Sequence, residues 1–484
     1  MRRLLGAKEL LETLLEFKQN TYRDICAIFK DSKSGKFDLS GNHPLIPYLK
    51  QIIDDRKNYI GVATNSEQKN IEFALEAISL HFTTKILFIK LIEDLSSGPG
   101  TPRIIHTLFP REEYDLIGGL FGFKVLNGMS KKDSTKALRL YVKSRRFYRD
   151  MAKDIAKVTW QDIFRYGFNV HTDQYGKVFK AENYDRFLPS ESTLANIRDE
   201  LIKIDIRSAI IYRSSKDAGP ENVIGHIYER LIDEELRNSI GAIYTPDATV
   251  TFMTELGRSF LGRFRKHKIV EPSCGSGHFY RKVYREYVNE VLLDQQSAGH
   301  PDDPIAAHRE ALSHIYGRDI DPFAVQLTLL GTFLEQLRDN VRPAEKALHH
   351  KRWSADLAVD TQNSLDPITV NPDLYFDIEK TADLHRAISR QRSCKRAEHP
   401  NLIIGNPPYG VKVVPGAHYD DIYDLQSKDS YGYFIVNAIR RLSEGSRVIF
   451  IVSSSFLTIQ SHQKLRKFIL DHTKIVRVIK LHRA

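Results

Sequence analysis

The sequence predicts an α/β fold in which a doubly wound parallel sheet follows a mostly helical N-terminal domain. From about residue 269 onward, short apolar runs of strand length alternate with stretches of helix length, which is the pattern of a parallel sheet. Before about residue 220, apolar residues recur at helical spacing instead, as in 10–17 and 71–78. We therefore expect two domains, 1–220 and 221–484.

The composition is that of a globular protein with a sizeable core. The chain has 484 residues, of which 42% are hydrophobic and 27% charged. No apolar stretch reaches membrane-spanning length and the N-terminus lacks a signal pattern, so we expect no membrane association and a cytoplasmic location. The cysteines form no disulfide framework, and no Cys/His spacing predicts a metal site.

The charge pattern favours a polyanionic partner. The formal net charge is +10 and the isoelectric point is near 9.2. Segment 139–149 alternates basic and aromatic side chains, and a second basic group lies within 386–396. Such runs suit phosphates and stacked bases, although each is equally consistent with a solvated helix face.

The expected elements of the second domain begin with a strand and a helix, 269–271 and 280–293. Further strands are predicted at 315–319, near 368–370, and at 401–405, 447–452 and 475–481. A helix at 463–471 joins the last two. Segment 160–189 is aromatic and irregular, and it predicts no element.

A glycine-rich turn follows the first strand. Glu271 ends this strand, Gly275 and Gly277 form the turn, and a helix begins directly after it. Glycines tolerate positive φ and let backbone approach a ligand closely, while a helix start supplies free amides. The second strand ends in Asp319, where doubly wound folds usually hold a ribose hydroxyl pair.

A predicted helix start precedes the glycine turn. Thr245 is a good N-cap residue, Pro246 suits the first helical position, and Asp247 is favourable in the first turn. Alone, this pattern predicts no more than a well-capped helix. Such a start can also bind a small carboxylate, such as the methionine end of S-adenosylmethionine.

Four predicted catalytic residues, Asn406, Pro407, Pro408 and Tyr409, follow the strand at 401–405. The exocyclic amino group of adenine is a poor nucleophile because its lone pair is delocalised into the ring. The Asn side-chain oxygen and the next carbonyl can accept both amino hydrogens and so free the lone pair. The prolines fix the turn, and the tyrosine offers a face for an extruded base.

Along the chain, the helix start comes first, the glycine turn second and the Asn-Pro-Pro-Tyr segment third. Motifs in this order resemble those of the gamma-class DNA adenine-N6 methyltransferases, above all type I modification subunits and fused type IIG enzymes. The resemblance begins near residue 224 and runs to the C-terminus. It implies a class I methyltransferase sheet, S-adenosylmethionine as cofactor, and methylation of a flipped adenine in a restriction-modification or phage-defence system. It implies cofactor contacts from Thr245, Glu271, Pro272, Gly275, Gly277, Phe279, Asp319 and Asn363.

The resemblance also implies partners and a domain plan. Double-stranded DNA is the expected substrate, and a specificity or restriction subunit, or a C-terminal recognition domain, is expected to supply site choice. The helical domain would bind DNA or a partner, with 88–94 in its central helix, and 338–400 would be an insertion. The family's last strand and a recognition domain are expected to be missing. Strand 475–481 should then pair with 447–452 or lie loosely at the sheet edge.

Three alternatives stay open at this point. The chain could be a non-catalytic DNA-binding subunit. It could also methylate glutamine in a protein or guanine in RNA, since those enzymes share the Asn-Pro-Pro-Tyr motif, although the helical domain and Thr245-Pro246 argue against this. A cytosine-N4 enzyme would more often have Ser at position 406. The DNA recognition sequence does not follow from these residues.

Overall fold

The computed structural model describes residues 3–4, 6–56, 66–95, 159–175, 183–206, 225, 227, 230–232, 245–339, 359–361, 364, 399–410, 425, 427 and 429–481. The chain divides into two compact units between residues 233 and 234. The expected domain boundary near 220 stays a prediction. Within the described ranges, no helix is long and apolar enough to span a bilayer.

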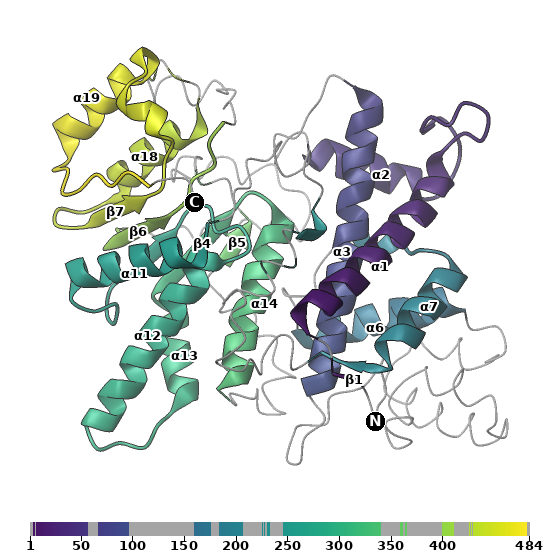
Figure 1. The fold of residues 1–484 in the computed structure, drawn as a ribbon, viewed down its shortest axis with the longest axis horizontal. Coiled ribbons are helices and arrows are strands. Elements are labelled where there is room, and N and C mark those ends of the chain that lie inside the picture. The colour runs from purple at the N-terminus through teal and green to yellow at the C-terminus, as the bar shows by residue number, and fades with distance from the viewer. Residues whose placement is uncertain are drawn as a thin grey trace, which may run out of the picture. The chain divides into compact units, whose positions relative to one another are not determined.

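The first unit is helical, which confirms the expectation for the N-terminal region (Figure 1). A short parallel pair joins residues near the two ends of this unit, β1 (Arg3–Leu4) and β2 (Ile204–Asp205). Segment 160–189, for which the sequence predicted no element, contains a helix and a 3₁₀ turn. The helices are α1 (Ala7–Phe29), α2 (Ile46–Asp55), α3 (Glu67–Leu95), α6 (Trp160–Tyr175) and α7 (Glu191–Leu201), and the turn is Tyr184–Arg186.

Helix α3 is buried along most of its length and includes the predicted central segment 88–94. Two of its lysines are buried, and each has an acidic partner: Lys85 pairs with Asp185, and Lys90 with Asp94 at 2.8 Å. Buried charges need such partners, since an unpaired ion loses its hydration without compensation.

The second unit contains a five-stranded parallel sheet in the order β5-β4-β3-β6-β7. The chain begins in the middle of this sheet, moves outward on one side, and returns to cover the other side, which is the doubly wound arrangement that the sequence predicts. Val270 in the central strand pairs with Tyr316 and Ile403. The strands are β3 (Ile269–Glu271), β4 (Ile315–Asp319), β5 (Val359–Thr361), β6 (Leu402–Gly405) and β7 (Arg447–Phe450).

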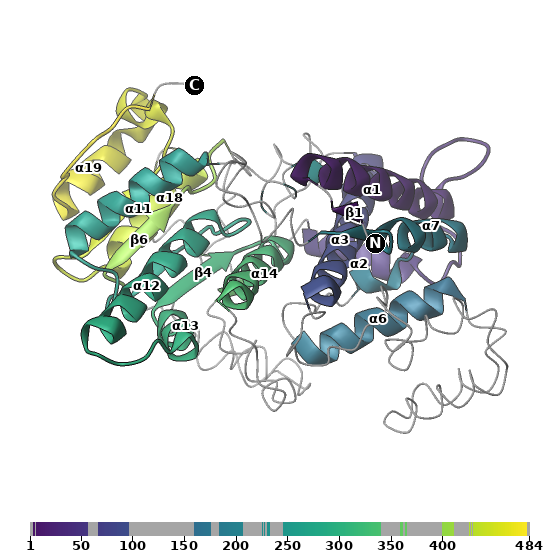
Figure 2. The same ribbon diagram turned by 60° about the horizontal axis from the view of Figure 1, so that its bottom comes forward.

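Helices cover both faces of the sheet (Figures 1 and 2). Alternate residues of β6 face opposite ways, so Leu402 lies against Gly257 of α11, whereas Ile403 packs with Ala438 of α18. A Cβ atom at Gly257 would lie 2.9 Å from Leu402 Cδ2, so glycine permits this close approach. The helices are α11 (Asp247–Leu261), α12 (His278–Ser297), α13 (Pro304–Leu312), α14 (Pro322–Arg338), α18 (Ser430–Arg441) and α19 (Gln463–His472).

Two predicted strands were wrong. The strand beside β4 is β5, at Val359–Thr361, rather than the segment near 368–370. Residues 475–481 form no strand, and Val476 and Val478 are 54% and 59% exposed. The expected pairing of 475–481 with β7 is therefore absent from the described part of the sheet, and the looser alternative describes this segment better.

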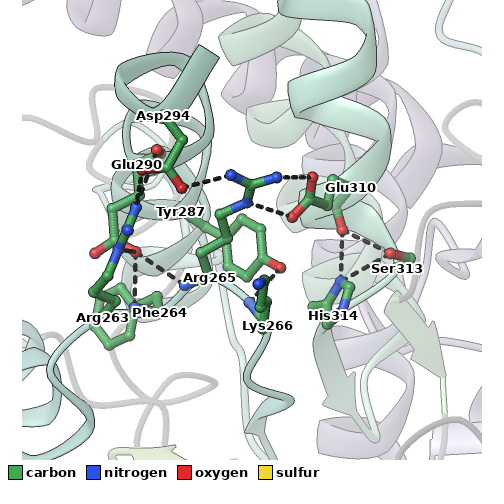
Figure 3. Close-up of polar contacts among 10 residues, drawn as sticks. All are labelled: Arg263, Phe264, Arg265, Lys266, Tyr287, Glu290, Asp294, Glu310, Ser313 and His314. Carbon is green, nitrogen blue, oxygen red and sulfur yellow. Dashed lines mark hydrogen bonds and ion pairs between the residues drawn. The ribbon is translucent and has the colours of Figure 1, made fainter. Parts of the chain in front are cut away.

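An ionic cluster anchors the loop that leads into β3 (Figure 3). Arg265 bridges two helices, because its guanidinium bonds Glu310 of α13 at 2.8 Å and Asp294 of α12 at 2.5 Å. Glu290 accepts the backbone N–H groups of Phe264 and Arg265 at 2.8 and 2.9 Å. These bonds fix the amino end of the central strand and thereby the position of the residues at its carboxyl end.

Candidate active site

The glycine turn joins β3 to α12. Gly275 and Gly277 have φ values of +51° and +84°, in the left-handed region that glycine tolerates best. The Glu271 carboxylate, at the end of β3, accepts the backbone N–H of Tyr280 at 2.7 Å and so holds the first turn of α12. The sequence therefore folds this strand, turn and helix as predicted.

Asp319 ends the neighbouring strand β4 and reaches the same turn. Its Oδ2 accepts the N–H of Gly275 at 2.9 Å, and its Oδ1 accepts the N–H of Asp321 at 3.0 Å. Burial raises the Asp319 pKa to about 6, although these backbone bonds stabilise the ionised form. A buried acid with such a raised pKa is a candidate to accept a hydrogen bond from a ligand.

The Glu271 carboxyl is also buried. Its pKa is raised well above the ordinary value, first by burial and further by the charge of Asp319, while the hydrogen bond from Tyr280 opposes this rise. The two acids thus lie close enough to influence each other. In the described residues, no group of side chains has the arrangement of a metal site.

Thr245 has a different position from the one predicted. The N-cap of α11 is Pro246, so the helix begins one residue later than expected and Thr245 does not cap it. The hydroxyl of Thr245 instead accepts a hydrogen bond from Asn406 Nδ2 at 3.0 Å. Two motifs that are 161 residues apart therefore meet through their side chains.

Asp247, in the first turn of α11, contacts His278 at the start of α12. This contact joins the helix-start motif to the glycine-turn motif. His278 was not predicted as a site residue, although its place between the glycines and the helix is a usable signal.

The Asn-Pro-Pro-Tyr segment is held from both of its ends. Ser273 Oγ donates to the backbone carbonyl of Asn406 at 3.3 Å, which ties the β6 segment to the turn after β3. Ser430 Oγ donates to the carbonyl of Pro408, and the N–H of Gly410 donates to Asp429 at 3.2 Å. None of these three anchoring side chains was predicted, because isolated Ser and Asp residues carry no distinctive pattern.

Tyr409 is partly buried against the core cluster that includes Tyr431 and Phe434 of α18. Burial raises the Tyr409 pKa, and a hydrogen bond with the Asn406 side chain opposes this rise. The ring is therefore held beside the side chain of Asn406.

The remaining predicted residues have separate surroundings. The carbonyl of Pro272 accepts a hydrogen bond from Ser364 Oγ at 2.6 Å. The side chain of Phe279, in α12, is buried. Asn437 of α18 donates to the carbonyl of Ser364, which ties the segment after β5 to the site. Asn363 lies outside the described residues, as do the basic runs in 139–149 and 386–396.

Comparisons with known sequences find similarity to DNA methyltransferases. Residues 313–484 match the family model of the Eco57I restriction-modification methylase, a range that includes Asp319 and the Asn-Pro-Pro-Tyr segment. The chain is 25% identical over 198 residues to the adenine-specific methyltransferase PglX of Streptomyces coelicolor, covering 38% of this chain and 16% of that protein. It is 22% identical over 244 residues to the type II methyltransferase M.TthHB8I of Thermus thermophilus, covering 48% and 39%.

A solved structure also resembles the chain. It is the methyltransferase subunit of a type I restriction-modification system from Streptococcus thermophilus, with a TM-score of 0.40, 13% identity, and coverage of 88% of this chain and 78% of that one. The chain spans well under half the length of the sequence relatives it matches. The expected resemblance is confirmed for residues 313–484, which match the family model of the Eco57I restriction-modification methylase.

Proposed function

We propose that this chain is a DNA adenine-N6 methyltransferase of a restriction-modification or phage-defence system and that it uses S-adenosylmethionine. One observation carries the proposal. Asn406 stands at the carboxyl end of β6, bonded to Thr245 and tied by its backbone to Ser273 of the glycine turn. An amide that can polarise an amino group thus lies beside a turn suited to a nucleoside cofactor.

The residues of the glycine turn fit such a cofactor. A Cβ atom at Gly275 would meet nothing within 4 Å, so the turn borders open space there. Asp319 would accept from the ribose hydroxyls, and Glu271 would keep the turn and the first amides of α12 in place. Asn363 and Phe279 stay predictions as cofactor contacts. When bound, S-adenosylmethionine supplies an electrophilic methyl group.

The chemistry of the protein itself lies in the Asn-Pro-Pro-Tyr segment. Asn406 Oδ1 and the Pro407 carbonyl would accept the two amino hydrogens of an extruded adenine and make its nitrogen more nucleophilic. The Pro408 carbonyl bonds Ser430 instead, so this bond fixes the turn rather than the base. Tyr409 would stack on the base and keep it out of the duplex.

Double-stranded DNA is the proposed substrate, and a specificity subunit, a restriction subunit or a C-terminal recognition domain is the proposed source of site choice. The match to a restriction-modification methylase family and the similarity to an adenine-specific and a type II methyltransferase support this plan. Region 1–220 is proposed to bind DNA or such a partner. A cytoplasmic location is part of the same proposal.

Methylation of plasmid DNA with S-adenosylmethionine, mapped by base-resolved sequencing, tests this function. We expect N6-methyladenine to form with the parent chain, in the presence of its recognition partner if one is required, and not with Asn406→Ala. Methylation of cytosine, or of protein or RNA substrates in place of DNA, would contradict the proposal. Equal product from both chains would remove Asn406 from the mechanism.

A further inference from the structure

We infer that Thr245 is a positioning residue that sets the orientation of the Asn406 carboxamide, in addition to any contact it makes with the cofactor. This inference rests on the proposed function, because it assigns a task to the amide oxygen of Asn406. It goes beyond the sequence-based roles of Thr245, which were helix capping and cofactor binding.

The two ends of an Asn side-chain amide have opposite hydrogen-bonding roles. The amide nitrogen only donates and the amide oxygen only accepts, so a carboxamide that is turned over presents the wrong group to a substrate. An adenine amino group offers hydrogens, and only the Oδ1 end of Asn406 can accept them. Catalysis by Asn406 therefore requires something that holds its nitrogen elsewhere.

Thr245 meets this requirement. Asn406 Nδ2 donates to Thr245 Oγ1 at 3.0 Å, and Thr245 is only 6% exposed, so water does not compete freely for the bond. Tyr409 also lies beside Asn406, and a hydrogen bond between their side chains opposes the rise in the Tyr409 pKa that burial causes. With its nitrogen directed to the Thr245 hydroxyl, the amide directs its oxygen the opposite way.

The position of the Thr245 hydroxyl is itself fixed. Asp247, two residues later, contacts His278 at the start of α12. Further along α11, Gly257 lies directly against Leu402 at the start of β6, the strand that ends just before Asn406. Helix α11 is thus attached both to the glycine turn and to the catalytic strand, and a rigid support is what an orienting group needs.

Thr245→Val is the decisive variant, because valine keeps the shape of threonine and removes the acceptor. The amide nitrogen would then be buried without this partner, and the carboxamide could turn. Thr245→Ser restores the hydroxyl. Thr249→Val makes the same chemical change one turn along α11 and serves as the matched control.

The first readout is the split between binding and turnover. We expect Thr245→Val to lower the single-turnover methylation rate by about tenfold or more, the effect of losing one hydrogen bond in a buried site. The KM for DNA and the affinity for S-adenosylhomocysteine should change by less than about twofold, and Thr245→Ser should recover most of the rate. Equal losses of rate and of cofactor affinity would make Thr245 a cofactor contact only and overturn the inference.

The second readout does not need activity. In chain labelled with ¹⁵N-asparagine, the side-chain amide signal of Asn406 is identified by its loss in Asn406→Asp. We expect its hydrogen exchange to be slow in the parent and in Thr245→Ser, and about tenfold faster or more in Thr245→Val, since one hydrogen bond is lost. Unchanged exchange in Thr245→Val would overturn the inference. If the parent methylates nothing, the proposed function fails, while this readout still decides whether Thr245 orients the amide.

Discussion

The carboxylate of Asp319 accepts the backbone N–H of Gly275 at 2.9 Å, so the acid that ends one strand shapes the turn that follows its neighbour. One oxygen of the carboxylate serves the turn, and the other accepts the N–H of Asp321. Asp319 is therefore part of the wall of the proposed cofactor site as well as a candidate ligand contact.

Replacing Asp319 by alanine should weaken cofactor binding. The change removes a charge-assisted hydrogen bond, worth about 1.5–3 kcal/mol or roughly tenfold or more in affinity, and it also frees the turn at Gly275. Titration calorimetry with S-adenosylhomocysteine measures the effect. Asp321→Ala, two residues away, should cost less, and equal affinity of Asp319→Ala and parent would contradict the assignment.

Cofactor affinity should depend on pH through Asp319. Burial raises its pKa to about 6, so the free protein holds the proton below this pH. Ribose hydroxyls favour the ionised acceptor, so the affinity for S-adenosylhomocysteine should rise with pH up to about 6 and then level off. Asp319→Asn should lose this rise.

The same raised pKa affects stability with the opposite sign. The folded chain binds the proton of Asp319 more tightly than the unfolded chain, in which the Asp319 pKa has its ordinary value of 3.8. The contribution of Asp319 to stability therefore falls as the pH rises from 3.8 to about 6. Glu271, whose pKa is also raised, contributes in the same direction, and Glu271→Gln separates the two. Thermal melts at a series of pH values measure both.

Substitutions at Gly275 and Gly277 should have different effects on stability and on cofactor binding. At Gly277 a Cβ atom would lie 2.7 Å from Thr328 Oγ1 and 3.0 Å from its Cα, so Gly277→Val should lower the melting temperature by disturbing the packing of α12 on α14. At Gly275 a Cβ atom meets open space and only the positive φ strains a side chain, so Gly275→Val should destabilise the fold less than Gly277→Val and should also obstruct the cofactor. Comparing melting temperature with S-adenosylhomocysteine affinity tells the two apart; tight binding by Gly275→Val would contradict the proposed site.

The Asn406 amide should matter for turnover and little for cofactor binding. Asn406→Ala is expected to abolish methyl transfer and to leave S-adenosylhomocysteine affinity near that of the parent, because the lost contacts form with the base in the transition state. Tyr409→Ala should weaken binding of an extruded adenine, whereas Tyr409→Phe keeps the stacking face and should have a mild effect. Gel-shift assays with a DNA duplex containing an abasic partner position would measure the adenine contact.

The exposed segment 475–481 should contribute little to stability. Replacing Val476 or Val478 by Thr is expected to leave the free energy of unfolding within about 0.5 kcal/mol, as at other surface positions. Leu465→Ala in α19, where the side chain is 1% exposed, should cost about 2–5 kcal/mol instead. A large effect of the valine substitutions would mean that this segment is packed in solution.

The sequence was a good guide to strands that carry their own signals. β3, β6 and β7 contain continuous apolar runs, and β4 ends in the acidic residue of a motif, so their positions could be predicted. β5 could not, because it has three residues and depends on its pairing with Gly317 and its neighbours in β4. Segment 475–481 has high strand propensity, yet propensity decides nothing without a neighbouring strand to pair with.

For the candidate site too, the sequence predicts the residues that belong to motifs but not the contacts that depend on the fold. The types of residue at Glu271, Asp319 and Asn406 follow from their motifs, and a parallel sheet brings the carboxyl ends of its strands to one edge. The contact between Thr245 and Asn406 could not be predicted, since it depends on where α11 lies on the sheet. The one-residue shift of the helix start is within the one or two residues to which helix ends are defined, so sequence signals do not fix it.

The ionic cluster around Arg265 has a consequence for how such a domain can change over time. Its bonds to Glu310 and Asp294 lie at the amino end of β3 and involve none of the proposed site residues. Replacing Asn406 or Asp319 therefore leaves these bonds in place. A descendant that had lost all chemistry could still carry the same architecture, and its resemblance to active relatives would outlive the activity.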